Sequence, residues 1–260
     1  MEQYPPSVRS AALAMIRQGA SYADVTERFG VPRGTLGWWR SQERRALGIP
    51  VPDHRPDCPR CQGRPFGHSA YSYLLGLYLG DGHIISRGKQ HHLSLFCSAR
   101  WPGLVQAAEE AMQAVMSRPR ISRRTRNGCV EVKSFSRHWV CMFPQHGPGR
   151  KHERRIVLES WQETIVDEHP WEFVRGLIHS DGSRVTNWVV RTIGGEPKRY
   201  EYPRYFFTNT SVDIMALFTG TLDRLGVEWR SLRQHRRAVT VSIARRESVA
   251  LLDARVGAKY

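Results

Sequence analysis

LLGLYLGDG at residues 74–82 and VRGLIHSDG at residues 174–182 are two versions of one short pattern. Each version places two small residues four positions apart, Gly76 with Gly80 and Gly176 with Ser180. Because residues i and i+4 share one face of a helix, each segment predicts a helix with a nearly bare stripe. Such a stripe allows two helix backbones to approach closely.

Both segments end on Asp-Gly, at positions 81–82 and 181–182. Glycine after the last helical turn commonly ends a helix. A carboxylate at that end lies near the negative pole of the helix dipole and the unpaired last carbonyl groups. A single Asp-Gly would be read as a solvated turn. Two of them, each behind a small-residue stripe, would bring Asp81 and Asp181 together with carbonyl oxygens, a donor set that suits Mg²⁺.

The composition indicates a nucleic-acid partner. The 260 residues suit one large domain or two to three small ones, and 39 Lys and Arg against 24 Asp and Glu give a net charge of +15. No apolar run is long enough for a membrane helix, and no signal-peptide pattern opens the chain. Five cysteines with one CxxC argue against a disulfide scaffold. We expect a cytoplasmic, nucleoid-associated protein with no membrane partner.

Residues 1–47 predict three short helices, over 7–18, over 21–29 and through Trp39 to about residue 45, with a tight turn at 30–32. This arrangement resembles a helix-turn-helix, whose last helix enters the DNA major groove. A small bundle used for dimerisation is the alternative, but the basic third helix favours DNA binding. The candidate DNA contacts are Arg33, Thr35, Trp38, Arg40 and Arg44.

Residues 48–69 are rich in Pro and Gly and predict a linker. The segment contains His54, Cys58, Cys61 and His68, which could form a zinc knuckle because structural zinc takes four Cys or His ligands. A single CxxC without a second pair is a weak indication, so a metal-free linker remains the alternative. The remaining cysteines, on or beside predicted strands, are interpreted as small apolar residues: Cys97, Cys129 and Cys141.

From residue 70 onward the chain predicts an internal repeat, over 70–168 and 169–260, with the order helix, hairpin, helix, hairpin, helix. Residues 96–98 align with 207–209, and 130–132 with 239–241. A helix over about 154–165 closes the first repeat, whereas the second is expected to lack its closing helix. The predicted class is α+β: tandem pseudo-two-fold αββαββα repeats after a small all-α domain, forming a monomer with two saddle-like sheets. Basic candidates for DNA contact in these repeats are Arg118, Arg120, Arg123, Arg124, Lys133, Arg191, Arg230 and Arg233.

The paired motifs and the repeated plan resemble the LAGLIDADG homing endonucleases in their single-chain, two-repeat form, over residues 70–260. The resemblance implies that the motif helices form the interface between the halves and that the sheets bind a long DNA duplex. It also implies that Asp81 and Asp181 bind Mg²⁺ or Mn²⁺ for phosphodiester hydrolysis, supported by the backbone carbonyls of Gly80 and Ser180.

The same resemblance places a polar, water-positioning residue at the end of the first hairpin, here Ser98 and Asn209. It places a basic residue near the scissile phosphate, here Arg150 (or Lys151) and Lys259. Ser98 departs from the family's pattern, because a hydroxyl positions water less well than an amide.

Two functions follow from this reading. The first is a site-specific double-stranded DNA endonuclease, and the second is a domesticated transcriptional regulator that binds DNA without cutting it. A bacterial sporulation-regulator family combines the same two modules but has its helix-turn-helix at the other end. Both functions predict salt-sensitive DNA binding. Retention of both aspartates favours the enzyme.

Overall fold

The computed structural model describes residues 4–49, 58–87, 90–117, 119–233 and 238–260. Internal contacts divide the chain into two compact units, Met1–Arg55 and Pro56–Tyr260. The segment predicted as a linker is therefore split, and its second half packs with the larger unit. No helix among the described residues has the length and apolar character needed to cross a bilayer.

The first unit contains the three predicted helices around a small core. Ser21 caps the second helix in a capping box with Asp24, and Gly30, at a φ of +67°, ends it in the left-handed conformation. Leu36 and Trp39 of the third helix are buried against the other two. The helices are α1 (Pro6–Arg17), α2 (Tyr22–Phe29) and α3 (Arg33–Ala46).

The second unit contains two four-stranded antiparallel sheets of the same topology, β1-β2-β4-β3 and β5-β6-β8-β7. The first sheet consists of β1 (His83–Arg87), β2 (Gln90–Ser98), β3 (Ile121–Arg126) and β4 (Cys129–Phe135). The second consists of β5 (Gly182–Ile193), β6 (Glu196–Asn209), β7 (Arg230–Arg233) and β8 (Val239–Ile243). This architecture confirms the predicted two-repeat α+β fold.

Helices cover one face of each sheet and leave the other face open. In β2 and β4, Leu93, Leu95 and Val132 point into the core beneath the helices, and the residues between them point to the opposite face. The helices of this unit are α4 (Pro59–Gln62), α5 (His68–Leu79), α6 (Pro102–Val115), α7 (Trp139–Met142), the 3₁₀ helix η1 (Lys151–Glu153), α8 (Ser160–Glu168), α9 (Pro170–Asp181), α10 (Val212–Arg224) and α11 (Arg246–Arg255).

The closing helices differ from expectation in the start of the first and in the presence of the second. In the first repeat the helix α8 starts at Ser160, because Glu159 and Gln162 form a capping box there and the preceding segment is extended. The second repeat does have a closing helix, α11. Only Ser248, Val249 and Leu252 are buried on it, so its apolar periodicity in the sequence is faint.

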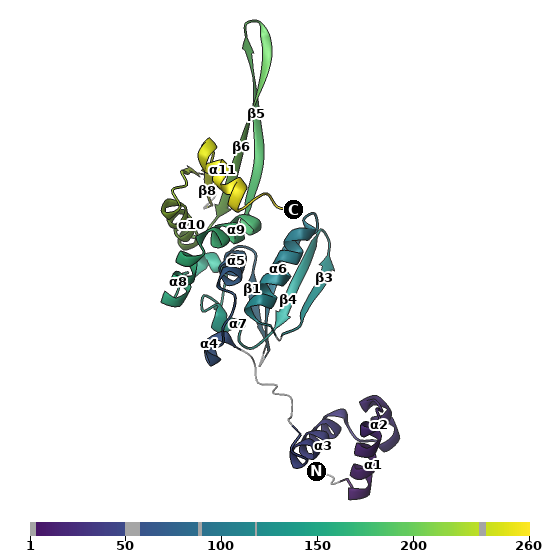
Figure 1. The fold of residues 1–260 in the computed structure, drawn as a ribbon. Helices are drawn as coiled ribbons and strands as arrows, with labels where there is room; N and C mark the ends of the chain where they lie inside the picture. Colours follow the sequence, from purple (N-terminus) through teal and green to yellow (C-terminus); the bar gives the residue numbers. More distant parts are fainter. Residues whose placement is uncertain (1–3, 50–57, 88–89, 118, 234–237) are drawn as a thin grey trace. The chain divides into compact units, whose positions relative to one another are not determined.

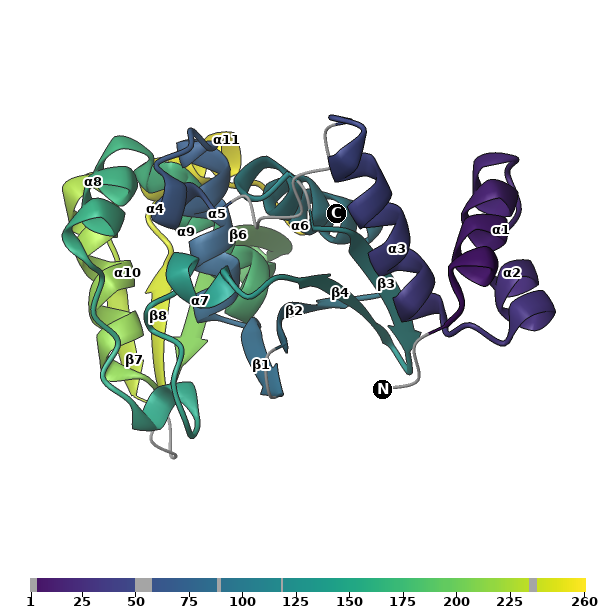
Figure 2. The same ribbon diagram turned by 90° about the horizontal axis from the view of Figure 1, so that it is seen from below.

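The two motif helices α5 and α9 lie side by side at the centre of this unit, between the sheets (Figures 1 and 2). A Cβ atom on Gly76 would lie 2.5 Å from the Phe173 carbonyl oxygen and 2.8 Å from the Gly176 Cα atom. A Cβ atom on Gly176 would in turn collide with the Tyr73 carbonyl oxygen. The small residues thus allow direct backbone contact, as the bare stripes predicted.

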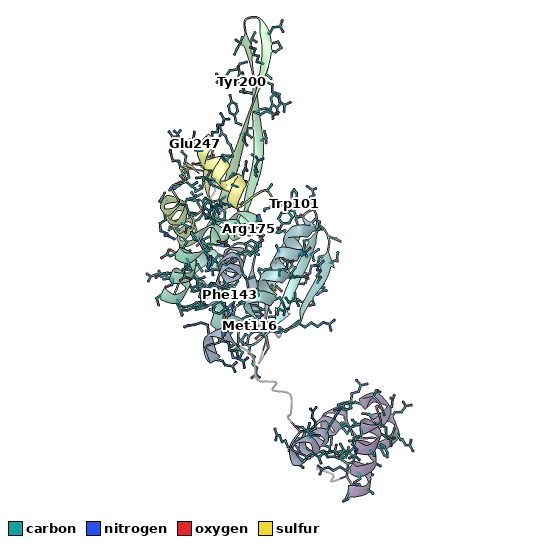
Figure 3. The ribbon with its side chains drawn as sticks, viewed as in Figure 1. Trp101, Met116, Phe143, Arg175, Tyr200 and Glu247 are labelled. Atoms are coloured by element: carbon teal, nitrogen blue, oxygen red, sulfur yellow. The ribbon has the colours of Figure 1, made fainter. Side chains whose placement is uncertain are left out.

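The β5–β6 hairpin is much longer than its counterpart in the first sheet. The two strands pair from Gly182↔Phe207 to Ile193↔Glu196, but β8 pairs only with residues 205–209 of β6. The remainder projects as a two-stranded arm (Figure 1), which carries Tyr200 (Figure 3). Exposed aromatic side chains, among them Trp188 and Tyr202, lie on this arm.

Candidate functional site at the ends of α5 and α9

The two Asp-Gly ends meet where α5 and α9 finish. A Cβ atom on Gly80 would lie 3.3 Å from Asp181 Oδ2 and would collide with the Ser180 side chain. Burial, and secondly the charge of Asp181, raise the pKa of Asp81 to about 6. The Asp81 side chain is nevertheless exposed, and contact with solvent reduces the cost of ionising its carboxyl group. Burial also raises the pKa of Asp181. Two carboxylates therefore share one partly desolvated position.

Two lysines occupy matching positions at the helix ends. Lys151 Nζ donates to the carbonyl oxygens of Tyr78, Leu79 and Gly80, at 2.5, 3.0 and 2.5 Å. Lys259 Nζ donates to the Ser180 carbonyl oxygen at 2.7 Å. Each ammonium thus satisfies C-terminal carbonyls that the helix itself leaves unpaired.

The electrostatics of the lysines follow from their surroundings. Burial lowers the pKa of Lys151 to about 8, although the charges of Asp181 and Asp81 act in the opposite direction. Burial likewise lowers the pKa of Lys259, against the same two aspartates. The centre therefore consists of two carboxylates opposed by two ammonium groups.

In the first half it is Lys151, and not Arg150, that reaches the end of α5. Arg150 is exposed at the N-cap of η1, and the chain turns inward only at the next residue. The backbone has the same conformation before each lysine: Gly149 and Gly257, two residues before Lys151 and Lys259, both have a positive φ, of +75° and +74°. Of the two alternatives for this position, the structure therefore favours Lys151 over Arg150.

The strand register also corrects the expected partner of Asp81. In the second sheet Gly182 pairs with Phe207 and Phe207 with Val241, so Asn209 is two residues beyond that pairing. In the first sheet the pair Leu95↔Val132 corresponds to the pair Phe207↔Val241 of the second. The residue two positions after Leu95 is Cys97, which is therefore the equivalent of Asn209. Ser98 is one residue further and points to the opposite, open face of the sheet. The alignment of residues 96–98 with 207–209 was therefore displaced by one position.

Asn209 and Cys97 have different effects on their aspartates. Asn209 Nδ2 donates to Asp181 Oδ2 at 2.8 Å, while Asn209 Oδ1 accepts from the Ser211 backbone N–H at 2.8 Å and is thereby oriented. Cys97 lines the same small cavity as Asp81. Burial, and secondly the Asp81 charge, raise the pKa of the Cys97 thiol to about 12, so it is neutral. A neutral thiol is a weak donor and a weak acceptor.

The donor atoms at this centre fit a hard divalent cation. They are carboxylate and backbone carbonyl oxygens, which suit Mg²⁺, Mn²⁺ and Ca²⁺ rather than softer metals. The Gly80 and Ser180 carbonyl oxygens also accept from the two lysine ammoniums, so a cation bound there would replace those two hydrogen bonds.

The basic candidates on the sheets are distributed over both faces. Arg124 and Lys133 lie on the open face, as does Arg230 of the second sheet. Arg123 lies on the covered face, where its guanidinium donates two hydrogen bonds of 2.6 Å to the Glu109 carboxylate of α6. The others are Arg120, exposed before β3; Arg191, exposed on the arm; Arg233, in β7; and Arg118, which lies outside the described residues.

The candidates of the first unit all lie on α3. Trp38 is 57% exposed and has the Arg9 guanidinium 5.9 Å from its ring centroid. Arg33 and Arg40 are exposed, and Thr35 and Arg44 are half-buried. These positions form a basic and aromatic helix surface.

Of the four residues considered for a zinc knuckle, His54, Cys58, Cys61 and His68, those that the structure describes do not come together as one group. Cys58 and Cys61 come together with His138 and Cys141, and their four ligand atoms lie within 4.8 Å of one another. His68 instead lies 3.3 Å from Glu168, and His54 is outside the described residues. Cys141 lies in α7, not on a strand. The second pair, His138-x-x-Cys141, was visible in the sequence and was missed because it lies far from the first.

Comparison with solved structures shows the fold. The chain is similar to the I-DmoI complex with DNA and Mn, at a TM-score of 0.51 and 15% identity over 74% of this chain and 98% of that one. It is also similar to the LAGLIDADG meganuclease I-AabMI bound to uncleaved DNA (TM-score 0.47, 12% identity, 71% and 82% covered). A third is the N-terminal LAGLIDADG domain of DUF199/WhiA (TM-score 0.46, 14% identity, 75% and 86% covered).

No protein-family model matches the sequence, and no curated protein matches it. The conclusion about the fold rests on the structural similarity to I-DmoI, which shows the LAGLIDADG two-repeat fold.

Proposed function

We propose that this protein is a site-specific, metal-dependent DNA endonuclease that uses the two aspartates at the ends of α5 and α9. The observation that carries the proposal is the shared, partly desolvated position of Asp81 and Asp181, with a lysine against the carbonyl preceding each of them. Such a cluster costs stability, and perturbed carboxylates opposed by lysines are typical of functional sites. I-DmoI, a solved relative in fold, is described in complex with DNA and Mn.

Each residue has a distinct part in the proposed reaction. Asp81 and Asp181, with the Gly80 and Ser180 carbonyls, would hold Mg²⁺ or Mn²⁺. When bound, the metal supplies an activated water and stabilises charge on the phosphate oxygens. Lys151 and Lys259, whose charges interact with both aspartates, would neutralise the scissile phosphates, and Asn209 would orient a water or the Asp181 carboxylate.

The open faces of the sheets provide the proposed duplex-binding surface. Arg124, Lys133 and Arg230 lie on these faces, and a two-stranded ribbon such as the β5–β6 arm fits the DNA major groove. The net charge of +15 supports binding to a polyanion. We propose that α3 adds contacts in the manner of a helix-turn-helix, because its exposed face is basic and aromatic.

A second candidate function is transcriptional regulation without cleavage. The observation in its favour is Cys97, which leaves Asp81 without the amide that Asp181 has. An added three-helix unit with a basic third helix is also typical of a regulator. The retention of both aspartates and both lysines weighs against it.

The two functions are separated by selection on DNA. A pool of randomised or host genomic duplexes is incubated with the full chain and Mg²⁺, and cleaved ends are captured and sequenced, with EDTA as the control. An endonuclease yields a recurrent cut sequence that depends on Mg²⁺ and on both aspartates. A regulator yields a recurrent bound sequence that remains intact with Mg²⁺ or Mn²⁺.

A further inference from the structure

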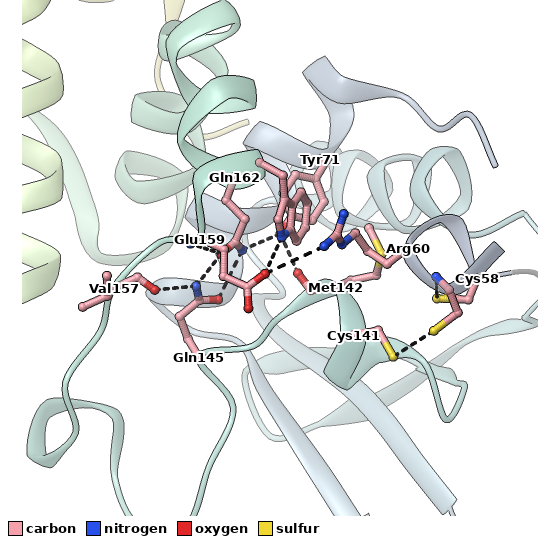
Figure 4. A network of polar contacts seen from close by, with 11 residues as sticks. Cys58, Arg60, Tyr71, Cys141, Met142, Gln145, Val157, Glu159 and Gln162 are labelled. Carbon is pink, nitrogen blue, oxygen red and sulfur yellow. Dashed lines mark hydrogen bonds and ion pairs between the residues drawn. The ribbon is translucent and has the colours of Figure 1, made fainter. Parts of the chain in front are cut away.

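Four possible metal ligands from two distant segments meet at one side of the first repeat. Cys58 is the N-cap of α4 and Cys61 lies within that helix. In the same way, His138 is the N-cap of α7 and Cys141 lies within it. Cys58 and Cys141 lie near each other in Figure 4. The cluster is separate from the aspartate centre and takes no part in the function proposed above.

The distances among three of the four ligand atoms match those of a tetrahedral site, and Cys58 Sγ lies within 4.8 Å of the other three. Cys61 Sγ lies 3.4 Å from His138 Nδ1 and 3.6 Å from Cys141 Sγ, and Cys141 Sγ lies 3.6 Å from His138 Nδ1. Zn–S bonds of about 2.3 Å and Zn–N bonds of about 2.0 Å imply ligand separations of about 3.5–3.8 Å around a tetrahedron. A zinc ion at the centre would therefore reach these three ligand atoms at normal bond lengths without moving them.

The backbone orients the two pairs toward each other. The Cys61 backbone N–H donates to Cys58 Sγ at 3.4 Å, which fixes the first sulfur, and Gly63, at a φ of +62°, turns the chain away after the second. His138 and Cys141 are three residues apart around one helical turn and so share a face. Cys58 is fully buried, while Cys61 remains exposed.

We infer that Cys58, Cys61, His138 and Cys141 form a structural zinc site. Thiolate and imidazole ligands are those that zinc prefers, and a complete set of four protein ligands is typical of structural sites, whereas catalytic sites keep an open position. The ion joins α4, where the chain leaves the first unit, to α7, across 77 residues that include α5 and the whole first sheet. Its role is to fasten the start of the larger unit to the first repeat.

The test measures metal content and does not depend on cleavage. The full chain is produced in zinc-supplemented medium, purified without immobilised-metal chromatography, and analysed by mass spectrometry for metals. We expect one zinc per chain in the wild type and in Cys129→Ser, a control cysteine outside the cluster. Cys61→Ser, Cys141→Ser and His138→Ala should lose the zinc.

A conservative variant separates ligand chemistry from misfolding. His138→Cys should keep the zinc, because a thiolate at this position has a reach similar to that of Nδ1. Replacement of the zinc by Co²⁺ in the wild type should give the visible absorption of a tetrahedral cobalt–thiolate site, and zinc removal by a chelator should lower the melting temperature.

Three results would overturn the inference. These are a wild-type chain that holds no stoichiometric zinc, equal zinc content in Cys61→Ser and Cys129→Ser, or a Cys61–Cys141 disulfide found by mass spectrometry of the alkylated chain. None of these readouts involves DNA. The zinc inference can therefore be rejected without rejecting the proposed endonuclease activity, and the endonuclease proposal can be rejected without rejecting the zinc site.

Discussion

Cys97 in the first repeat and Asn209 in the second occupy equivalent strand positions, each beside the aspartate of its own half. Asn209 donates to Asp181 at 2.8 Å, whereas the Cys97 thiol offers Asp81 only a weak, neutral neighbour. The pseudo-two-fold symmetry of the fold therefore does not extend to the chemistry of its centre.

This asymmetry predicts unequal cutting of the two DNA strands. On a plasmid carrying the selected site, the wild type should give nicked circles well before linear DNA. Cys97→Asn should increase the rate of the slow strand, because the new amide can orient water or the Asp81 carboxylate as Asn209 does for Asp181. Thr164→Asn, at an exposed position of α8, serves as the control. Equal rates on both strands in the wild type, unchanged by Cys97→Asn, would show that this strand position does not matter.

The two lysines should support cleavage more than binding. Lys151→Met removes a charge that lies against the Gly80 carbonyl, and we expect the cleavage rate to fall about 10²–10³-fold, as for the loss of one preorganised electrostatic contact. Binding of the uncleaved site should change little. Arg150→Met, at the exposed neighbouring position, should cleave nearly as the wild type does. Single-turnover rates and binding isotherms on the same duplex make the comparison.

The aspartates should destabilise the metal-free protein above pH 6. The pKa of Asp81 is raised from 3.8 to about 6, so its contribution to stability is full below pH 3.8 and is lost as the pH rises to about 6. In EDTA, Asp81→Asn should therefore melt like the wild type near pH 4 and higher than it at pH 7. Since Asp81 is open to solvent, we expect at most about 1 kcal/mol, or about 2–4 °C.

Asp167→Asn, at an exposed position of α8, is the control for the loss of a single negative charge. Added Mg²⁺ should reverse the order of the melting temperatures at pH 7, because only the wild type keeps both carboxylates for the metal. An Asp81→Asn variant that is less stable than the wild type at pH 7 in EDTA would contradict the assignment.

The contact between α5 and α9 should not tolerate a single methyl group. Gly76→Ala places a Cβ atom 2.5 Å from the Phe173 carbonyl oxygen, and we expect a loss of about 1–3 kcal/mol or more together with displaced aspartates. Gly220→Ala, in α10, has only the Arg224 guanidinium at 4.0 Å and should be stabilising by about 0.5–1 kcal/mol. Denaturant unfolding of both variants checks this, and equal stabilities would mean that the helices are not in backbone contact.

Charge on the open face of the first sheet should determine the salt dependence of DNA binding. Arg124→Gln should lower the slope of log K against log salt by about one unit, corresponding to one lost phosphate contact. Arg123→Gln should change it less, because that guanidinium is held by Glu109 on the covered face. The same slope for both variants would show that strand alternation does not define the DNA-binding face.

The sequence predicted the parts of the fold that depend on local pattern. The two small-residue stripes predicted the packing of α5 on α9, and the turn chemistry at Gly30 predicted the end of α2. The sequence could not predict the site residues whose positions depend on strand register or on contacts between distant segments. A slip of one residue exchanges the two faces of a strand, so the sequence alignment selected Ser98 where the fold presents Cys97.

The same limit applies to residues brought together across the chain. Lys151 and Arg150 are adjacent in sequence and both basic, and only the folded chain shows that Lys151 is the one that reaches the Gly80 carbonyl. Cys61 and Cys141 belong to short, well-spaced ligand pairs, but nothing local indicates that α4 packs on α7. Local spacing identified one pair, and tertiary packing supplied the other.

The most direct test of the central claim is a cleavage assay on the selected duplex with Mg²⁺, with binding measured in parallel for the wild type, Asp81→Asn and Asp181→Asn. We predict that the wild type cuts, that each variant binds the duplex as tightly as the wild type in EDTA, and that Asp181→Asn loses the faster strand cut. Tight wild-type binding with the duplex intact in both Mg²⁺ and Mn²⁺ would contradict the endonuclease and leave the regulator.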